Sequence, residues 1–219
     1  MSGAFPISNS KFQTMGIKSI QNTIISKSQS GKKLARQIDN QRFGFTARII
    51  TAKRSDVYGE LMAFIIKQRS GKENFTIIPP EIEDARGTET GTVLVNGVHA
   101  VADTTIAMDG FAGDGAGRFK PGDFVSFASH TKVYMVVADV TSSSNASTVT
   151  IEPPLITALA DNSTVTYDNV PFTVHLTNDI QEFGVVGTDK DGNLLYQNHN
   201  LEKNLLDRLI IKGLDLLQE

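Results

Sequence analysis

The chain has 219 residues and a mass of 23.8 kDa, enough for one large or two small domains. Hydrophobic residues make up 40% and charged residues 21%, which excludes a collagen-like or disordered composition. Because cysteine is absent, a disulfide framework, a cysteine-ligated metal site and thiol catalysis are also excluded. The longest uninterrupted apolar stretch, Leu61 to Ile66, is too short for a membrane span, and we expect no signal peptide.

Charge is distributed unevenly along the chain. Residues 1–80 contain 13 Lys or Arg and 4 Asp or Glu, whereas residues 81–170 contain 4 and 12. The basic residues of the first segment are dispersed, which favours a solvated face, or one that meets an acidic face of a neighbouring copy, over a nucleic-acid site. They include Lys11, Lys18, Lys27, Lys32, Lys33, Arg36, Arg42 and Arg48.

The first predicted elements are β-strands. Apolar and polar residues alternate over Phe43–Ile49, which predicts a half-buried strand with one solvent-exposed face. Asp39 and Asn40 precede it and predict a tight turn to an antiparallel partner strand within residues 34–38. Residues 20–25 form a further expected strand.

A single helix follows these strands. Apolar residues recur at helical spacing from Val57 to Ile65, Ser55 is a candidate N-cap and Gly71 a candidate stop, which predicts a helix of about 13 residues. A short strand at residues 75–78 is then closed by Pro79 and Pro80, which cannot continue a central strand. A domain boundary is therefore expected at this point.

Short strands separated by turns replace the helical pattern from residue 81 onward. Such spacing without a helical period predicts a small barrel or sandwich. Pro153 and Pro154 end the run, and a second boundary is expected near residues 161–163. The expected strands are Thr104–Met108, Asp123–Phe127, Lys132–Val137 and Thr148–Ile151.

The strand type of the first segment returns at Phe172–Leu176, where apolar and polar residues alternate again. We therefore predict a mainly β (α+β) fold in two domains. Residues 1–82 and 168–219 form a discontinuous domain of sheet and one packed helix, and residues 83–167 form a small inserted β-barrel.

The C-terminal stretch is open between two interpretations. A helix beginning near Asn200 would contain Leu201, Leu205 and Leu209, whereas residues 214–216 suit a terminal strand that Gly213 would separate from it.

Two glycine-containing segments superficially resemble ligand loops. Residues 113–117 (GDGAG) lead into another expected strand instead of the helix that a phosphate loop requires, so a flexible hairpin loop is predicted. Residues 189–193 (DKDGN) have the Asp-x-Asp spacing of a calcium loop but lack its helices and its final Glu, so a hairpin turn is predicted.

The remaining candidates give no catalytic constellation. No histidine pair has ligand spacing, and no Gly-x-Ser-x-Gly elbow supports a nucleophilic serine. We therefore predict no enzyme activity, no catalytic residue, no cofactor and no metal. The histidines are His99, His130, His175 and His199, and the sequons begin at Asn145 and Asn162.

Several segments resemble one protein family. Residues 119–127 (FKPGDFVSF), 130–136 (HTKVYMV) and 149–155 (VTIEPPL) resemble the inserted OB-like barrel of distal tail proteins from long-tailed bacteriophages. Residues 196–211 depart from that family, which usually ends in a plain strand. The segments that resemble its tail-tube-like β-sandwich domain are residues 24–31 (IISKSQSG), 41–46 (QRFGFT), 64–69 (FIIKQR) and 170–176 (VPFTVHL).

The resemblance implies a structural protein of the virion tail, made in the cytoplasm of the bacterial host. It implies a ring, usually of six copies, that joins the tail tube to the tail tip or baseplate. The expected partners are further copies of the chain, the tail tube protein and the tail hub or tip protein, with no membrane. Opposed charges of residues 1–80 and 81–219 suit head-to-tail contacts, so reversing Lys32, Lys33 and Arg36 should weaken assembly at low salt.

Other functions fit a small barrel. OB-like barrels often bind oligonucleotides or oligosaccharides. Residues 81–170 carry 4 basic against 12 acidic residues, which disfavours nucleic acid, including sequence-specific binding. Recognition of a host glycan stays as an alternative, with Tyr134 as the residue to test. A tail tube or tube-terminating protein is a further alternative, although an insert would then lie on the tube exterior at every layer.

Overall fold

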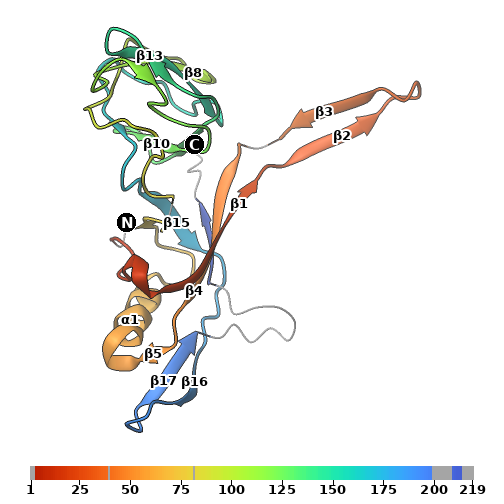
Figure 1. Cartoon of the computed structure of the whole chain (residues 1–219). Helices are drawn as coiled ribbons and strands as arrows, with labels where there is room; N and C mark the ends of the chain where they lie inside the picture. Colours follow the sequence, from red (N-terminus) through yellow and green to blue (C-terminus); the bar gives the residue numbers. More distant parts are fainter. Residues whose placement is uncertain (1–2, 39, 81, 199–208, 214–219) are drawn as a thin grey trace. The chain divides into compact units, whose positions relative to one another are not determined.

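The computed structural model describes residues 3–38, 40–80, 82–198 and 209–213. The chain divides into two compact units, Met1–Ile77 with Thr173–Glu219, and Ile78–Phe172. The sequence placed these junctions at 82/83 and 167/168, a few residues inside the second unit. The predicted β-rich fold with one helix and a small barrel is confirmed for the part of the chain that the structure describes (Figure 1).

A five-stranded sheet forms the centre of the first unit. Its order is β1-β4-β18-β15-β6, with β4 pairing antiparallel to both β1 and β18. Since β4 lies inside the sheet, Thr46 is buried as well as Phe45 and Ala47, so the predicted solvent-exposed face of this strand is wrong. The strands are β1 (Phe12–Ile20), β4 (Arg42–Ile49), β18 (Leu209–Gly213), β15 (Phe172–Leu176) and β6 (Phe75–Ile77).

A long ribbon leaves this sheet. Strands β2 (Thr23–Lys27) and β3 (Lys33–Gln37) pair with each other and continue the β1–β4 pair outward. The predicted partnership of residues 34–38 with residues 43–49 is therefore wrong, because the chain reverses earlier, where the Gly31 amide donates to the Ser28 carbonyl. We call residues 21–38 the arm; Figure 1 shows it extending from the sheet.

The helix is shorter than predicted and begins differently. A π-helical turn, Arg54–Tyr58, leads into α1, Gly59–Lys67. Lys53 precedes the turn, so Ser55 is not the N-cap. Arg69 and Ser70 adopt positive φ angles of 51° and 60° directly after the helix, so the chain turns before Gly71. The helix buries Val57, Tyr58, Leu61 and Ile65.

Two short features complete the first unit. A three-stranded sheet has the order β16-β17-β5, from β16 (Phe183–Thr188), β17 (Leu194–Asn198) and β5 (Ala52–Lys53). A short 3-10 turn, Asn9–Lys11, precedes β1. Strand β18 shows that the helix predicted to include Leu209 is wrong there, whereas Asn200, Leu201, Leu205 and residues 214–216 lie outside the described residues.

The second unit is a nearly closed barrel. Six antiparallel strands have the order β14-β10-β11-β13-β8-β7, and a bridge between Leu94 and Thr164 brings the two ends together. An OB-fold has five strands, so the barrel is larger than that resemblance implies. The strands are β7 (Leu94–Val95), β8 (Thr105–Asp109), β10 (Phe124–Phe127), β11 (Val133–Val136), β13 (Ala146–Glu152) and β14 (Val165–Thr166).

The barrel core comes from the inward positions of these strands and their loops. Closure removes the free edges that an open sheet would present. Ile106, Tyr134 and Ile151 are fully buried there, and Phe119 packs between Phe111 and Tyr167 at centroid distances of 5.7 and 5.2 Å. A two-stranded sheet of β9 (Gly115–Ala116) and β12 (Thr141–Ser142) lies within the same unit.

Candidate functional site

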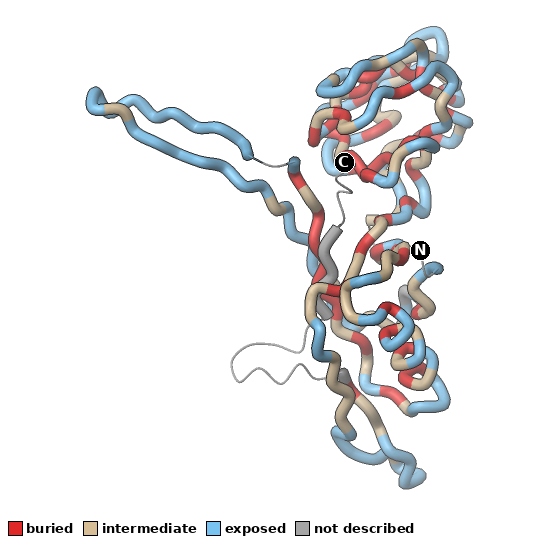
Figure 2. Tube along the Cα trace, turned by 180° about the vertical axis from the view of Figure 1, so that it is seen from behind, coloured by how far each residue is buried: buried red, intermediate tan, exposed pale blue. Residues whose placement is uncertain are grey.

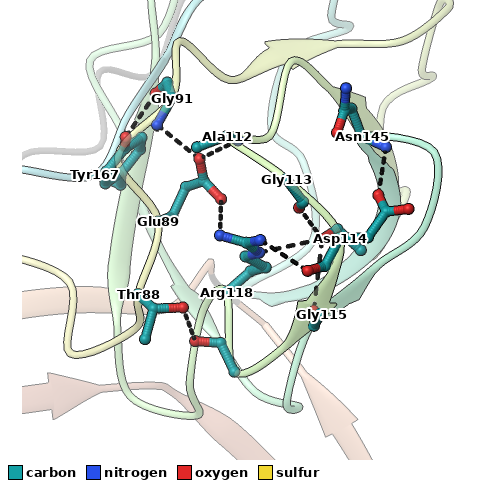
Figure 3. Close-up of polar contacts among 12 residues, drawn as sticks. Thr88, Glu89, Gly91, Ala112, Gly113, Asp114, Gly115, Arg118, Asn145 and Tyr167 are labelled. Carbon is teal, nitrogen blue, oxygen red and sulfur yellow. Dashed lines mark hydrogen bonds and ion pairs between the residues drawn. The ribbon is translucent and has the colours of Figure 1, made fainter.

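A polar cluster of the barrel unit centres on Glu89 and Arg118 (Figure 3). Glu89 Oε1 accepts hydrogen bonds from the Gly91 and Ala112 amides at 2.6 and 2.8 Å. Its second oxygen, Oε2, lies 3.7 Å from Nη1 of Arg118, and the Glu89 side chain is completely buried. A buried carboxylate requires such compensation because its transfer out of water is costly.

Arg118 extends the cluster to two further loops. Its Nε donates to Ser142 Oγ at 3.2 Å, and its Nη2 donates to the Asp114 carbonyl at 3.0 Å. The Asp114 carboxylate accepts the Asn145 amide at 2.8 Å, and backbone hydrogen bonds from Asn145 and Ser144 lower the pKa of Asp114. Together these contacts hold residues 87–91, 110–118 and 141–145 against one another.

Tyr167 closes the other side of the cluster. Its hydroxyl donates to the Gly91 carbonyl at 2.6 Å. Burial raises the pKa of Tyr167, and the charges of Asp168 and Glu89 raise it further. The neutral phenol is therefore the form that serves as a donor here. The contacts of the cluster are made with the protein's own backbone and, for Glu89–Arg118 and Arg118–Ser142, with its own side chains, so the cluster holds loops together as a clamp.

The glycine-rich segment 113–117 belongs to this clamp. Ser142 Oγ donates to the Gly113 carbonyl at 2.6 Å, and residues 115–116 form β9 against β12. The segment leads into β10 by way of residues 119–123, as the sequence indicates, and opens no helix. The rejection of a phosphate loop agrees with this geometry, but the predicted flexible hairpin is wrong. The strands that the segment joins, β8 and β10, are not neighbours in the sheet, β9 pairs with the distant β12, and several hydrogen bonds hold the loop.

The Asp189–Asn193 segment is the turn between β16 and β17. The Asp189 carboxylate accepts the Asp191 and Asn193 amides, each at 2.9 Å, and pairs with Lys53 at 2.6 Å. Hydrogen bonds from Lys53 and Asn193 hold the pKa of Asp189 far below its usual range. The predicted hairpin turn is confirmed, and the carboxylate is directed into its own turn and toward Lys53.

His99 and His130 contact different residues. His99 accepts the Ala107 amide through Nε2 and lies 3.7 Å from Asp103, whereas His130 hydrogen-bonds Tyr134 at 2.9 Å. His175 lies on β15, and His199 is outside the described residues. No group of three or more metal-ligating side chains occurs among the residues that the structure describes.

The aromatic residues of the barrel are buried. Tyr134 has no exposed surface, so the hypothesis that its ring supports a sugar is wrong. A carbohydrate platform needs an exposed aromatic face. The aromatic residues of residues 83–167 are each at most 7% exposed, and they are Phe111, Phe119, Phe124, Phe127, Tyr134 and Tyr167.

The most unusual surface is the arm, which sequence reasoning missed. Each residue of β2 and β3 is exposed, including Ile24, Ile25 and Leu34, which are 56%, 55% and 54% accessible (Figure 2). The sequence signal that could have revealed the arm is a pair of strand-forming segments of similar length on either side of the turn at residues 28–32.

The two sequons begin at turn positions, where Asn145 and Asn162 have φ angles of 56° and 61°.

Comparison with known protein families and with curated proteins finds no match for this chain. Within the described ranges, no helix is long and apolar enough to cross a membrane.

Proposed function

We propose that this chain is a structural protein of a bacteriophage virion, and that it forms a ring joining the tail tube to the tail tip or baseplate. The observation that carries the proposal is the architecture: a sheet-and-helix unit interrupted by a barrel, with an exposed arm extending from the sheet. A sheet-and-helix unit interrupted by a small barrel is what the sequence resemblance to distal tail proteins implies, and the arm is an additional feature of the structure.

An edge strand of the central sheet supports assembly. Strand β1 is nine residues long and lies at one end of the strand order, next to β4. The opposite edge strand, β6, is three residues long and is covered, since the Phe5 amide donates to Thr76 at 2.7 Å and the Thr76 amide to Gly3 at 3.1 Å. Long exposed edge strands favour pairing with another chain, and a closed ring gives every copy the same neighbour.

The polar clusters support a structural role. The contacts of the Glu89–Arg118 clamp are made with the protein's own loops, and the Asp189 carboxylate with its own turn and Lys53. A catalytic site requires an acid or base, a nucleophile and an anion-stabilising donor that converge on open space. We therefore include no reaction, cofactor or metal in the proposed function.

Immunogold labelling of virions tests the proposal. Antibody raised against the recombinant protein would be applied to virions from a lysate of the source host, with antibody pre-adsorbed on the recombinant protein as the control. Gold at the junction of tube and tip is the expected result. Labelling along the whole tube would assign the chain to the tube instead, and virions without label would overturn the proposal.

A further inference from the structure

The arm buries none of its strand residues within its own chain. The five residues of β2 and the five of β3 are exposed on both faces of the ribbon. An isolated two-stranded hairpin is at best marginally stable in water, and three or more strands or a packed partner are needed for a stable one. Ile24, Ile25, Leu34 and Ile38 are each more than half exposed. This apolar surface indicates that the arm is covered in the assembled protein.

The register of the arm places like charges opposite each other. Lys27 pairs directly with Lys33 across the ribbon, and Ile25 pairs with Ala35 on the same face. Like charges in directly opposed positions destabilise a sheet. Residues 3–38 contain no Asp or Glu, so no acidic residue of the arm or of β1 relieves this repulsion. The face that carries Ile25, Lys27 and Lys33 is suited to a partner surface that has acidic residues next to an apolar area.

The barrel unit supplies such a partner surface. Residues 78–172 contain 12 Asp or Glu and 4 Lys or Arg. Two of the acidic residues, Asp84 and Asp168, lie on adjacent exposed segments, because Asp84 Oδ1 accepts the Asn169 amide at 3.0 Å and the Ala85 amide donates to the Tyr167 carbonyl at 3.0 Å. Burial raises the pKa of Asp168, a hydrogen bond with the Ala85 backbone lowers it, and the neighbouring charge of Asp84 raises it. The two carboxylates therefore repel each other as the two lysines do.

We propose that the arm of one copy docks on the barrel unit of a second copy, with Lys27 and Lys33 placed against Asp84 and Asp168. Each like-charged pair loses its repulsion when it meets the other, and Ile25 leaves water in the same contact. The inference rests on the proposed ring and names the surfaces by which its copies meet.

Charge reversal in both partners tests the docking. One variant carries Lys27→Glu and Lys33→Glu, and the other carries Asp84→Lys and Asp168→Lys. In each variant alone the arm and the barrel of neighbouring copies repel, so we expect self-association, measured by sedimentation velocity at about 50 mM salt, to weaken by about tenfold or more. An equimolar mixture should assemble like the parent chain, because the altered arms then meet the altered barrels.

Two further variants separate the charge effect from other causes. Lys120→Glu with Lys190→Glu changes the net charge as much as the arm variant does but reverses exposed lysines elsewhere, and it should leave assembly unchanged. Ile25→Ser should weaken assembly by about tenfold at low and high salt alike, because its contribution is apolar. Far-UV circular dichroism and thermal unfolding of each variant confirm that the fold is intact.

Four outcomes would overturn the inference: arm variants that assemble like the parent, a mixture that fails to restore assembly, cross-links from the arm to the barrel of its own chain, or a parent that stays monomeric at roughly 100 µM. The proposed function has its own readout, since gold at the tube-to-tip junction is scored with the parent protein. A failure of the docking thus leaves the ring proposal standing, with its contacts assigned elsewhere.

Discussion

The barrel and the arm, both built from short antiparallel strands, differ in what their strands bury. In the barrel, the ends of the six-stranded sheet meet at Leu94 and Thr164, and the side chains between the strands form a closed core. In the arm, the two strands pair with each other, and among the described strands with no other, and their apolar residues face solvent. Figure 2 shows the contrast between the interior of the barrel and the exposed ribbon.

This difference assigns the stability of the single chain to the barrel and its association with other copies to the arm. The barrel forms its core within one chain, so substitutions there should act on the free energy of unfolding. Hydrophobic burial is the main favourable term in folding, and the arm contributes almost none of it in the single chain. Substitutions in the arm should therefore act on association and leave the unfolding of the monomer nearly unchanged.

Truncation of the barrel core should give the largest effect. Phe119 is fully buried between Phe111 and Tyr167, so Phe119→Ala should lower the free energy of unfolding by about 3–5 kcal/mol. Leu34→Ala in the arm is the matched control and should change it by less than about 0.5 kcal/mol. Urea unfolding followed by circular dichroism measures both, and equal losses at the two positions would break the comparison.

The Glu89–Arg118 clamp should give the next largest effect. Glu89→Ala leaves two amides without their acceptor and Arg118 without its carboxylate partner, so it should cost about 2–4 kcal/mol. Glu89→Gln keeps an oxygen for the amides and removes only the charge, so it should cost less. Urea unfolding measures both variants, and hydrogen exchange of residues 110–118 should rise in the same order. An alanine variant as stable as the parent would show that the clamp is dispensable.

The sequence predicted the barrel well because its signals are local. The four longer strands, β8, β10, β11 and β13, have 4–7 residues and are bounded by turn residues, and alternation within a strand fixes which side chains face inward. The two-residue strands β7 and β14 give no such signal and were not predicted. The Glu89–Arg118 clamp could not be predicted in this way, because its members come from loops far apart in the chain and follow no motif. Only the closure of the barrel brings Gly91, Ala112 and Ser142 to them.

The first unit was harder to predict because its pairings are decided over longer distances. The residues at 34–38 suit a hairpin with residues 43–49 or with residues 23–27, and alternation is compatible with either register. Leu209 follows Leu201 and Leu205 at helical spacing, yet residues 209–213 pair between β4 and β15. A place in the central sheet overrides local helical propensity in that segment.

Glycine substitutions compare the barrel and the arm through smaller expected losses of stability. Gly110 of the barrel has a φ angle of +76°, and a Cβ there would collide with the Thr92 carbonyl oxygen, so Gly110→Ala should cost about 2–3 kcal/mol. Gly31 at the arm turn has a φ angle of +81° with nothing within 4 Å, so Gly31→Ala should cost at most about 1 kcal/mol. Thermal unfolding of the two variants and the parent measures both losses of stability. A larger loss at Gly31 would show that the arm is coupled to the folded core.

The smallest expected effect is a pH dependence carried by His130 in the barrel. Burial lowers the pKa of His130 below 6.5, and a hydrogen bond with Ala158 partly offsets this. The stabilisation is therefore fully present above the unfolded pKa and is lost as the pH falls below about 6.5, where the unfolded chain takes up a proton first. Thermal unfolding at about pH 7.5 and about pH 5.5 should show a smaller decrease for His130→Gln than for the parent. Because the two proteins differ only at residue 130, the difference isolates His130. Equal decreases would show that this imidazole is protonated as easily in the folded barrel as in the unfolded chain.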